Sequence, residues 1–359
     1  MNLILFLGGL ATLVVGADLL VRGASRLALS LGISPLVVGL TVVAFGTSSP
    51  ELAVSVGAVL GGKTDIALGN VVGSNIFNVL SILGLSALVT PLTVNLQLIR
   101  QEVPIMIGAS LLLLLLGLDG RLGVVDGALL TGLLLVYTGF LIHQSRRQTQ
   151  AAHDQYAAGI QVVRAGGWTA RLPVQLALIV GGLVALVLGS DALVTASVAF
   201  AKALGVSDLV IGLTIIAAGT SMPELATSVA ASIKGERDMA VGNVVGSCTF
   251  NVLGCLGVSA LASGSAGLLV PAAALHFDLW VMTGVALACL PIFITGREIA
   301  RWEGAVFLLY YVAYVSYLVM AAQHHAALRA FSGVMMSFVL PLTVITLVVL
   351  LLRGRPAGA

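Results

Sequence analysis

Charged residues are scarce in this sequence. Asp, Glu, Lys and Arg make up 9% of the 359 residues, whereas a typical soluble domain carries about 25%. Hydrophobic residues reach 59%, and the mean hydropathy is +1.11. This composition excludes a soluble globular protein and predicts a polytopic membrane protein. The apolar runs are continuous and do not alternate, so they indicate helices and disfavour a β-barrel.

Cysteine and histidine are also rare. Cys248, Cys255 and Cys289 lie in apolar segments without a CxxC motif, so we interpret them as small buried side chains and not as disulfide or metal ligands. The five histidines lie in polar or terminal stretches, and neither HExxH nor GxGD occurs. An intramembrane hydrolase with a serine nucleophile would therefore lack a base. No basic segment precedes the first apolar run, which we interpret as a membrane helix and not as a signal peptide.

The apolar segments predict eleven membrane-spanning helices, since a crossing needs about 20 apolar residues. The predicted spans are residues 3–29, 35–60, 66–89, 103–118, 122–142, 172–204, 209–233, 239–261, 277–295, 302–321 and 331–352. A polar segment of residues 143–171 separates the fifth span from the sixth. The chain is thus predicted to be all-α.

Residues 39–88 recur as residues 212–261, in register and with most positions identical. Asp18 and Asp191 show the same spacing from these motifs, so the duplication includes the preceding helix. We therefore predict a first five-helix repeat over residues 1–142, a linker over 143–171 and a second five-helix repeat over 172–321. Residues 322–359 would add an eleventh helix and a tail.

An odd number of helices per repeat means that the second copy enters the membrane from the opposite side, as in many secondary transporters. If the linker is cytoplasmic, only four of the 17 basic residues face outward, namely Lys63, Arg121, Lys202 and Arg329. The positive-inside rule then places the N-terminus outside and the C-terminus in the cytoplasm. We expect a multi-pass protein of the plasma membrane.

The duplicated motif carries a Gly-Thr-Ser-Ser-Pro-Glu run inside apolar sequence. Pro50 has no backbone N–H, so a helix through it loses a hydrogen bond and bends. Glu51 places a carboxylate at membrane depth, where a charge costs several kcal/mol unless it is compensated. The second copy repeats this pattern with Pro223 and Glu224. A bent helix with hydroxyls and a carboxylate in the membrane is typical of a cation site.

The second part of each motif supplies further oxygen ligands of the kind that Ca2+ prefers. Ser74 and Asn78 are four residues apart and so share a helix face. Ser247 and Asn251 repeat this spacing, while Cys248 replaces the intervening asparagine. Two glutamates meeting at the midplane would carry a charge of −2, which one Ca2+ or two Na+ would neutralise. Such a site suits exchange by competition.

The sequences GTSSPE…GNVVGSNIFN and GTSMPE…GNVVGSCTFN resemble the two repeats of the Ca2+/cation antiporter superfamily, closest to its prokaryotic sodium/calcium exchanger branch. The resemblance covers nearly the whole chain except the last helix. It implies a ten-helix core with inverted halves, alternating access by sliding of the first and sixth helices, and four ion sites around the glutamates. It further implies a set of metal ligands: Thr47, Ser48, Glu51, Ser74, Asn78, Thr220, Ser221, Glu224, Ser247, Asn251 and the carbonyls of Ala44 and Ala217.

We therefore predict a secondary antiporter, not an enzyme, that exchanges Ca2+ for Na+ without a cofactor or a nucleic-acid partner. Exchangers of this type usually carry aspartate where this chain has Asn251, which leaves Ca2+/H+ exchange as the alternative. A passive cation channel is a weaker alternative, because inverted repeats favour alternating access. The asparagines could also serve as hydrogen-bonding contacts between helices, and the hydroxyls could bond to their own helix backbone.

Overall fold

The computed structural model describes residues 2–31, 33–156, 171–203 and 217–353. Within these ranges, nine helices are long and apolar enough to cross a membrane, and a tenth span results if a bent helix pair is counted as one. This confirms the all-helical, multi-span class. The predicted span 209–233 begins outside the described residues, so only its second part can be compared.

The first half consists of five spans. They are α1 (Asn2–Leu31); α2, η1, α3 and α4 (Pro35–Val38, Gly39–Val43, Ala44–Thr47 and Ser49–Leu60); α5, η2 and α6 (Thr64–Phe77, Asn78–Leu83 and Gly84–Val89); η3, α7 and η4 (Leu98–Glu102, Val103–Leu116 and Gly117–Asp119); and α8 (Val124–Tyr156). Two boundaries differ from the sequence prediction by more than two residues. The fourth span begins five residues early, in the π-turn η3 (Leu98–Glu102), and α8 continues past 142 because no Pro or Gly interrupts it there.

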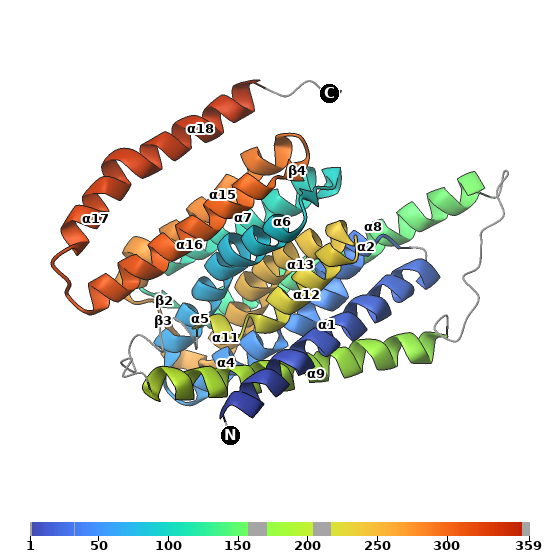
Figure 1. The fold of residues 1–359 in the computed structure, drawn as a ribbon, viewed down its shortest axis with the longest axis horizontal. Helices are drawn as coiled ribbons and strands as arrows, with labels where there is room; N and C mark the ends of the chain where they lie inside the picture. Colours follow the sequence, from blue (N-terminus) through green and yellow to red (C-terminus); the bar gives the residue numbers. More distant parts are fainter. Residues whose placement is uncertain (1, 32, 157–170, 204–216, 354–359) are drawn as a thin grey trace.

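The second half repeats this order. Its elements are α9 (Leu172–Ala203); α11 and α12 (Ala217–Gly219 and Met222–Ile233); α13, η7 and α14 (Arg237–Phe250, Asn251–Leu256 and Gly257–Ala262); η8 (Gly264–Ala266); η9 and α15 (Ala274–Asp278 and Leu279–Ile294); and α16 (Arg301–Ala322). The eleventh span is formed by α17, η10 and α18 (Leu328–Val334, Met335–Val339 and Leu340–Arg353). It lies on the outer side of α15 and α16 (Figure 1).

Two short antiparallel strand pairs show how the halves are related. Strand β1 (Leu92–Thr93) pairs with β4 (Glu298–Ile299), and β2 (Arg121–Leu122) pairs with β3 (Leu268–Leu269). By position in the repeat, β1 corresponds to β3 and β2 corresponds to β4. Figure 1 shows β4 and the β2–β3 pair at opposite ends of the molecule, so equivalent elements of the two halves are inverted.

Helices α1 and α9 pack antiparallel along their length (Figure 1). Their contact is built on glycines seven residues apart: Gly9 and Gly16 on α1 face Gly189 and Gly182 on α9. A Cβ atom added to Gly16 would lie 2.8 Å from the backbone nitrogen of Leu186. The two backbones can therefore approach this closely only with glycine at these positions.

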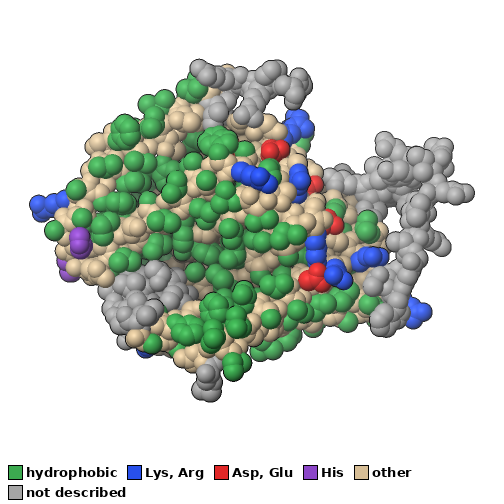
Figure 2. All heavy atoms as spheres, viewed as in Figure 1, with side chains coloured by type: hydrophobic (Ala, Val, Ile, Leu, Met, Phe, Trp, Pro, Cys, Tyr) green, Lys and Arg blue, Asp and Glu red, His purple; other side chains and the backbone are tan. Residues whose placement is uncertain are grey.

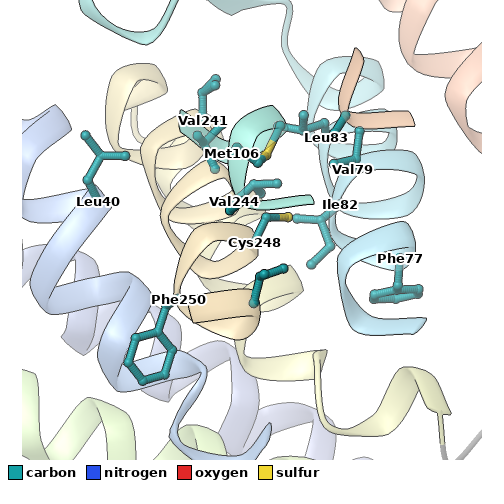
Figure 3. Packing of buried hydrophobic residues seen from close by; sticks show 14 of the residues in the cluster. Leu40, Phe77, Val79, Ile82, Leu83, Met106, Val241, Val244, Cys248 and Phe250 are labelled. Atoms are coloured by element: carbon teal, nitrogen blue, oxygen red, sulfur yellow. The ribbon is translucent and has the colours of Figure 1, made fainter. Parts of the chain in front are cut away.

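The two spans that contain the GNVVGS segments form the centre of the molecule. The most apolar window of the span over Thr64–Val89 is 83% buried, and that of the span over Arg237–Ala262 is 89% buried. Figure 3 shows Val241, Val244 and Cys248 of α13 facing Ile82 and Leu83 of η2. Because these central helices are shielded from lipid, polar side chains on them need partners within the protein or a bound ion.

An acid–tyrosine hydrogen bond ties the fourth helix to the fifth in each half. Tyr137 donates to Glu102 at 2.6 Å, and Tyr314 donates to Asp278 at 2.9 Å. Glu102 is fully buried and also accepts from Gln97 and Gln101. Glu102 and Asp278 each end a π-turn, η3 or η9, which the apolar pattern alone did not predict.

The appended helix packs loosely. Tyr310 of α16 hydrogen bonds to Thr343 of α18, and an apolar cavity of about 840 Å³ lies between α15, α16 and this last span, with Trp280, Gly284 and Met335 in its wall. Apolar side chains are spread across the face in Figure 2, whereas Lys and Arg gather mainly toward one end. That distribution is typical of a membrane protein with one positively charged side.

Candidate ion-binding site

The two broken helices bend where proline enters. Helix α3 ends at Thr47, and α4 begins at Ser49 with proline in its first turn; the two segments differ in direction by 41°. In the second half, α12 begins at Met222, also with proline in its first turn, after the turn residues Thr220 and Ser221. Proline is tolerated there because the first N–H groups of a helix have no intrahelical partner. Each break exposes a hydroxyl pair just before the glutamate.

The glutamates are held by serines of the opposite half. The hydroxyl of Ser48 donates to Oε1 of Glu224 at 2.8 Å, and the hydroxyl of Ser221 donates to Oε1 of Glu51 at 2.9 Å. All four side chains are fully buried. Since Ser48 precedes Glu51 by about one helical turn, the Glu224 carboxylate lies close to Glu51. The inverted fold thus brings the two predicted acids together.

Several polar atoms of the predicted ligands have no partner in the described part of the chain. They are the second carboxylate oxygens of Glu51 and Glu224, the hydroxyls of Ser74 and Ser247, and both amide atoms of Asn78. All are buried, and each such group costs about 1–3 kcal/mol when it is left unsatisfied. A bound cation would satisfy the oxygen atoms among them.

Asn78 and Asn251, although equivalent in sequence, have different surroundings. The Asn251 amide nitrogen donates to Oδ1 of Asn75 at 3.1 Å, and its oxygen accepts from the Cys255 thiol at 3.6 Å. Asn75 also donates to the carbonyl of Cys248 at 3.2 Å. The second half therefore presents Asn251 within a network of asparagine and cysteine side chains, whereas Asn78 belongs to no such network in the described part of the chain.

The remaining predicted ligands lie beside the breaks. Thr47 donates to Oδ1 of Asn243, and Thr220 donates to Oδ1 of Asn70, both at 3.3 Å. The Ala44 carbonyl accepts the backbone N–H of Ser48 at 3.0 Å and lies within reach of the Thr47 hydroxyl at 3.4 Å, so at most one of its lone pairs is available to a cation. Ala217 is the first residue of α11.

Asn70 and Asn243 were not identified by the sequence analysis. Both are the second residue of a GNVVGS segment, and they occupy equivalent positions in the two halves. Their repetition could have identified them, because an asparagine at the same position of both apolar repeats predicts an equivalent role in each half.

The donor set is hard and oxygen-rich. No group of three or more His, Cys, Asp or Glu side chains suited to a metal occurs in the residues that the structure describes. Two carboxylates with hydroxyl and amide oxygens favour Ca2+ or Na+ over transition metals, which prefer imidazole and thiolate.

Comparison with known proteins agrees with this chemistry. The family model described as "Sodium/calcium exchanger protein" matches residues 1–143 and 174–320. Sodium/calcium exchanger MaX1 of Methanosarcina acetivorans is 34% identical over 343 residues, covering 88% of this chain and 97% of that protein. Inner membrane protein YrbG of Escherichia coli is 39% identical over 259 residues, covering 72% of this chain and 78% of that protein.

Among solved structures, the sodium-calcium exchanger NCX_Mj soaked with zero Na+ and Ca2+ matches with a TM-score of 0.74 and 30% identity. The match covers 88% of this chain and 98% of that one. The family predicted from the doubled motif is thereby confirmed, and with it an all-helical exchanger fold. The chain belongs to the sodium/calcium exchanger protein family.

Proposed function

We propose that this protein is a secondary antiporter that exchanges Ca2+ for Na+ by alternating access, with the ions bound between Glu51 and Glu224. The observation that carries the proposal is the pair of reciprocal bonds, Ser48 to Glu224 and Ser221 to Glu51, which leave the second oxygen of each carboxylate without a hydrogen-bond partner in the described part of the chain. Each bond fixes one oxygen of a carboxylate and leaves the other free to bind a cation. The family membership supports the same function.

In this mechanism the two glutamates supply a charge of −2, which one Ca2+ or two Na+ balances. The empty site would leave two buried, uncompensated charges in a low-dielectric environment, which is strongly unfavourable. Reorientation of the empty protein is therefore suppressed, and transport of one ion depends on return of the other. This requirement distinguishes the antiporter from a passive channel.

The ligand assignment follows from the same contacts. Glu51, Glu224, Ser74, Ser247 and Asn78 offer unpartnered oxygens and are the principal ligands. Hydroxyl oxygens at the breaks come from Ser48, Ser221, Thr47 and Thr220. Asn251 and the carbonyls of Ala44 and Ala217 complete the set.

We further propose that residues 1–142 and 172–321 are the two transport units. In this topology the linker 143–171 and the C-terminus are cytoplasmic, and the N-terminus is outside.

Ca2+/H+ exchange is the second candidate, because Asn251 removes an acid from the site and protons compete with cations for carboxylate oxygens. The network of Asn251 with Asn75 and Cys255 favours this as an alternative, since it reduces the oxygen donors that are free for a third monovalent ion.

Efflux of isotopically labelled Ca2+ from proteoliposomes distinguishes the two candidates. We expect an external Na+ gradient to accelerate efflux, while K+ or a pH step does not. If the rate of Ca2+ efflux does not change with Na+ but rises with the pH step, Ca2+/H+ exchange is the function.

Asn251→Asp adds a carboxylate, and we expect it to make the rate more dependent on Na+ concentration because a further cation is needed to balance the charge. An unchanged Na+ dependence would contradict the role of Asn251.

A further inference from the structure

Asn70 and Asn243 make the same contacts in the two halves. The Asn70 amide nitrogen donates to the Glu51 carbonyl at 3.3 Å and to the Ser55 hydroxyl at 3.0 Å. The Asn243 amide nitrogen donates to the Glu224 carbonyl at 3.5 Å and to the Ser228 hydroxyl at 2.9 Å. Each asparagine thus fixes the backbone of the glutamate in its own half.

The amide oxygen of each asparagine contacts the other half. With the nitrogen bound to two acceptors, the oxygen must point the opposite way, and there it accepts the hydroxyl of Thr47 or Thr220. A hydroxyl has one proton and two lone pairs. A threonine that donates its proton to asparagine therefore turns its lone pairs to other neighbours, and can offer them to a cation. Thr47 has a second acceptor in reach, the Ala44 carbonyl at 3.4 Å, but that bond stays within one helix.

We propose that Asn70 and Asn243 are positioning residues that couple the two half-sites. Each orients the glutamate of its own half and the threonine of the other half, so that the two sets of ligands assemble together around one ion. The proposal rests on the proposed transport function. It resembles the way in which outer-shell partners of metal ligands set their orientation, where a substitution costs about 10–100-fold in affinity.

A double-mutant cycle tests the coupling. The variants are Thr47→Val, Asn243→Leu and Asn70→Leu, read as the Ca2+ concentration for half-maximal transport and as the maximal rate. We expect each single variant to raise the half-maximal concentration about 10-fold. Thr47→Val with Asn243→Leu should be no worse than the more damaging of the two single variants, because the bond between Thr47 and Asn243 is already lost in either one. Thr47→Val with Asn70→Leu should multiply the two effects, because these residues share no bond.

Multiplication in both pairs, or an unchanged half-maximal concentration in the asparagine variants, would overturn the coupling. Failure of the proposed function gives a different result, namely wild-type protein without Ca2+ flux. If the wild type shows no Ca2+ flux, the same variants are compared by melting temperature in ion-free buffer. Additive effects of Thr47→Val and Asn243→Leu on the melting temperature would show that the two residues are not coupled, which also overturns the positioning role.

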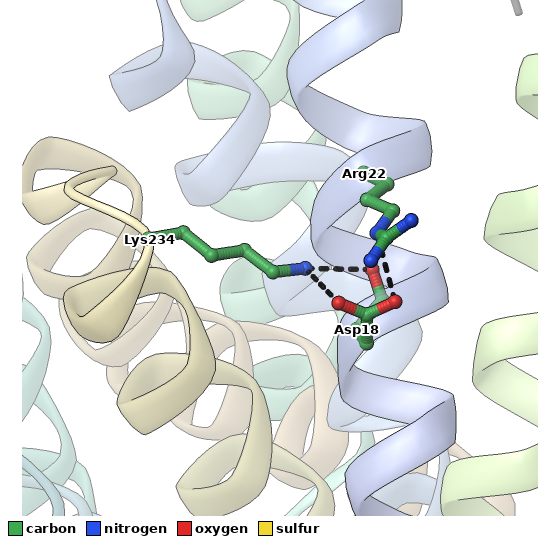
Figure 4. A network of polar contacts seen from close by, with 3 residues as sticks. All are labelled: Asp18, Arg22 and Lys234. Carbon is green, nitrogen blue, oxygen red and sulfur yellow. Dashed lines mark hydrogen bonds and ion pairs between the residues drawn. The ribbon is translucent and has the colours of Figure 1, made fainter.

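A second inference comes from an ion cluster at one end of the molecule. Lys234, which follows α12, lies 2.7 Å from a carboxylate oxygen of Asp18 on α1 and donates to its backbone carbonyl at 2.9 Å (Figure 4). Arg22 contacts the other carboxylate oxygen at 2.8 Å. The equivalent acid in the second half is Asp191, but Gly61 occupies the position of Lys234 in the first half. Among the described residues, a lysine bond to this acid therefore occurs in one half only.

We infer that this bond biases alternating access toward the conformation seen here, in which α1 is held against the end of α12. If the two inverted halves made identical contacts, the two access states would have equal free energy. A bond that forms in only one half stabilises one access state over the other and so changes their populations. This inference also rests on the proposed function. Partly exposed ion pairs of this kind change an equilibrium by a factor of about 1.5–5.

The test compares half-maximal Ca2+ concentrations on the two sides of the membrane. Lys234→Gln should lower the ratio between the two sides about 1.5–5-fold, whereas Lys63→Gln, at the opposite end, should leave it unchanged. Gly61→Lys gives the first half its own partner for Asp191 and should also reduce the asymmetry. An unaltered ratio in both Lys234→Gln and Gly61→Lys would overturn the inference, and absence of Ca2+ transport in the wild type would overturn the function on which it rests.

Discussion

Glu51→Gln and Glu224→Gln are each expected to abolish Ca2+ transport. The substitution keeps the shape of the side chain and can keep its bond to the serine of the other half, but it halves the charge that balances the cation. Breaking a buried charge interaction costs about 3–5 kcal/mol, which corresponds to a loss of affinity of about 100-fold or more. The measurement is the initial rate of Na+-driven Ca2+ efflux per amount of folded protein.

Glu102→Gln is the matched control for this experiment. Glu102 is as completely buried as Glu51, but its carboxylate already accepts hydrogen bonds from Tyr137, Gln97 and Gln101. We expect this variant to lower the melting temperature and to keep transport. If Glu102→Gln stopped transport as fully as Glu51→Gln, loss of any buried carboxylate would be sufficient, and the assignment of the ion site to Glu51 and Glu224 would lose its support.

Gly182→Leu is expected to have the second large effect. A Cβ atom at this position would lie 2.6 Å from the backbone nitrogen of Leu20 and 2.8 Å from the carbonyl of Gly16. Backbone atoms cannot move aside as a flexible side chain can, so α1 and α9 must separate. Overpacking of this kind costs about 1–3 kcal/mol or more. We expect a strongly reduced yield of monodisperse protein and a lower melting temperature.

The neighbouring residue supplies the control. Gly181 is exposed, and a Cβ atom added there meets no atom within 4 Å. Gly181→Leu makes the same chemical change one residue away on the same helix, and it should leave yield and melting temperature near those of the wild type. Equal damage from both variants would show that leucine is not tolerated anywhere in this part of α9 and that the close contact with α1 is not the reason.

Much of the architecture follows from local pattern. Apolar length predicts most helices, and the doubled motif with an odd helix count predicts inversion, which the placement of the β1–β4 and β2–β3 pairs shows. The π-turns that begin the spans at Leu98 and Ala274 were missed, because a polar first turn resembles a loop when its buried partners are unknown. Glu102, at the end of η3, is an example: the tyrosine that donates a hydrogen bond to it, Tyr137, lies 35 residues further along the chain.

The candidate site was only partly predictable for a related reason. Proline, glutamate and hydroxyls at doubled positions indicate which residues matter, but not which half each one contacts. That Ser48 bonds to Glu224 depends on how the inverted halves pack. Likewise, the difference between Asn78 and Asn251 arises from Asn75, whose counterpart in the second half is Cys248. Neither relation can be derived from one copy of the motif.

The central claim is that the two halves share one ion site between Glu51 and Glu224. Equilibrium binding of Ca2+ to the purified protein tests it most directly, with Na+ as competitor. We predict one Ca2+ per chain, displaced cooperatively by Na+ and lost in either single glutamine variant. Two independent Ca2+ sites, each lost with only one of the two glutamates, would contradict a shared site.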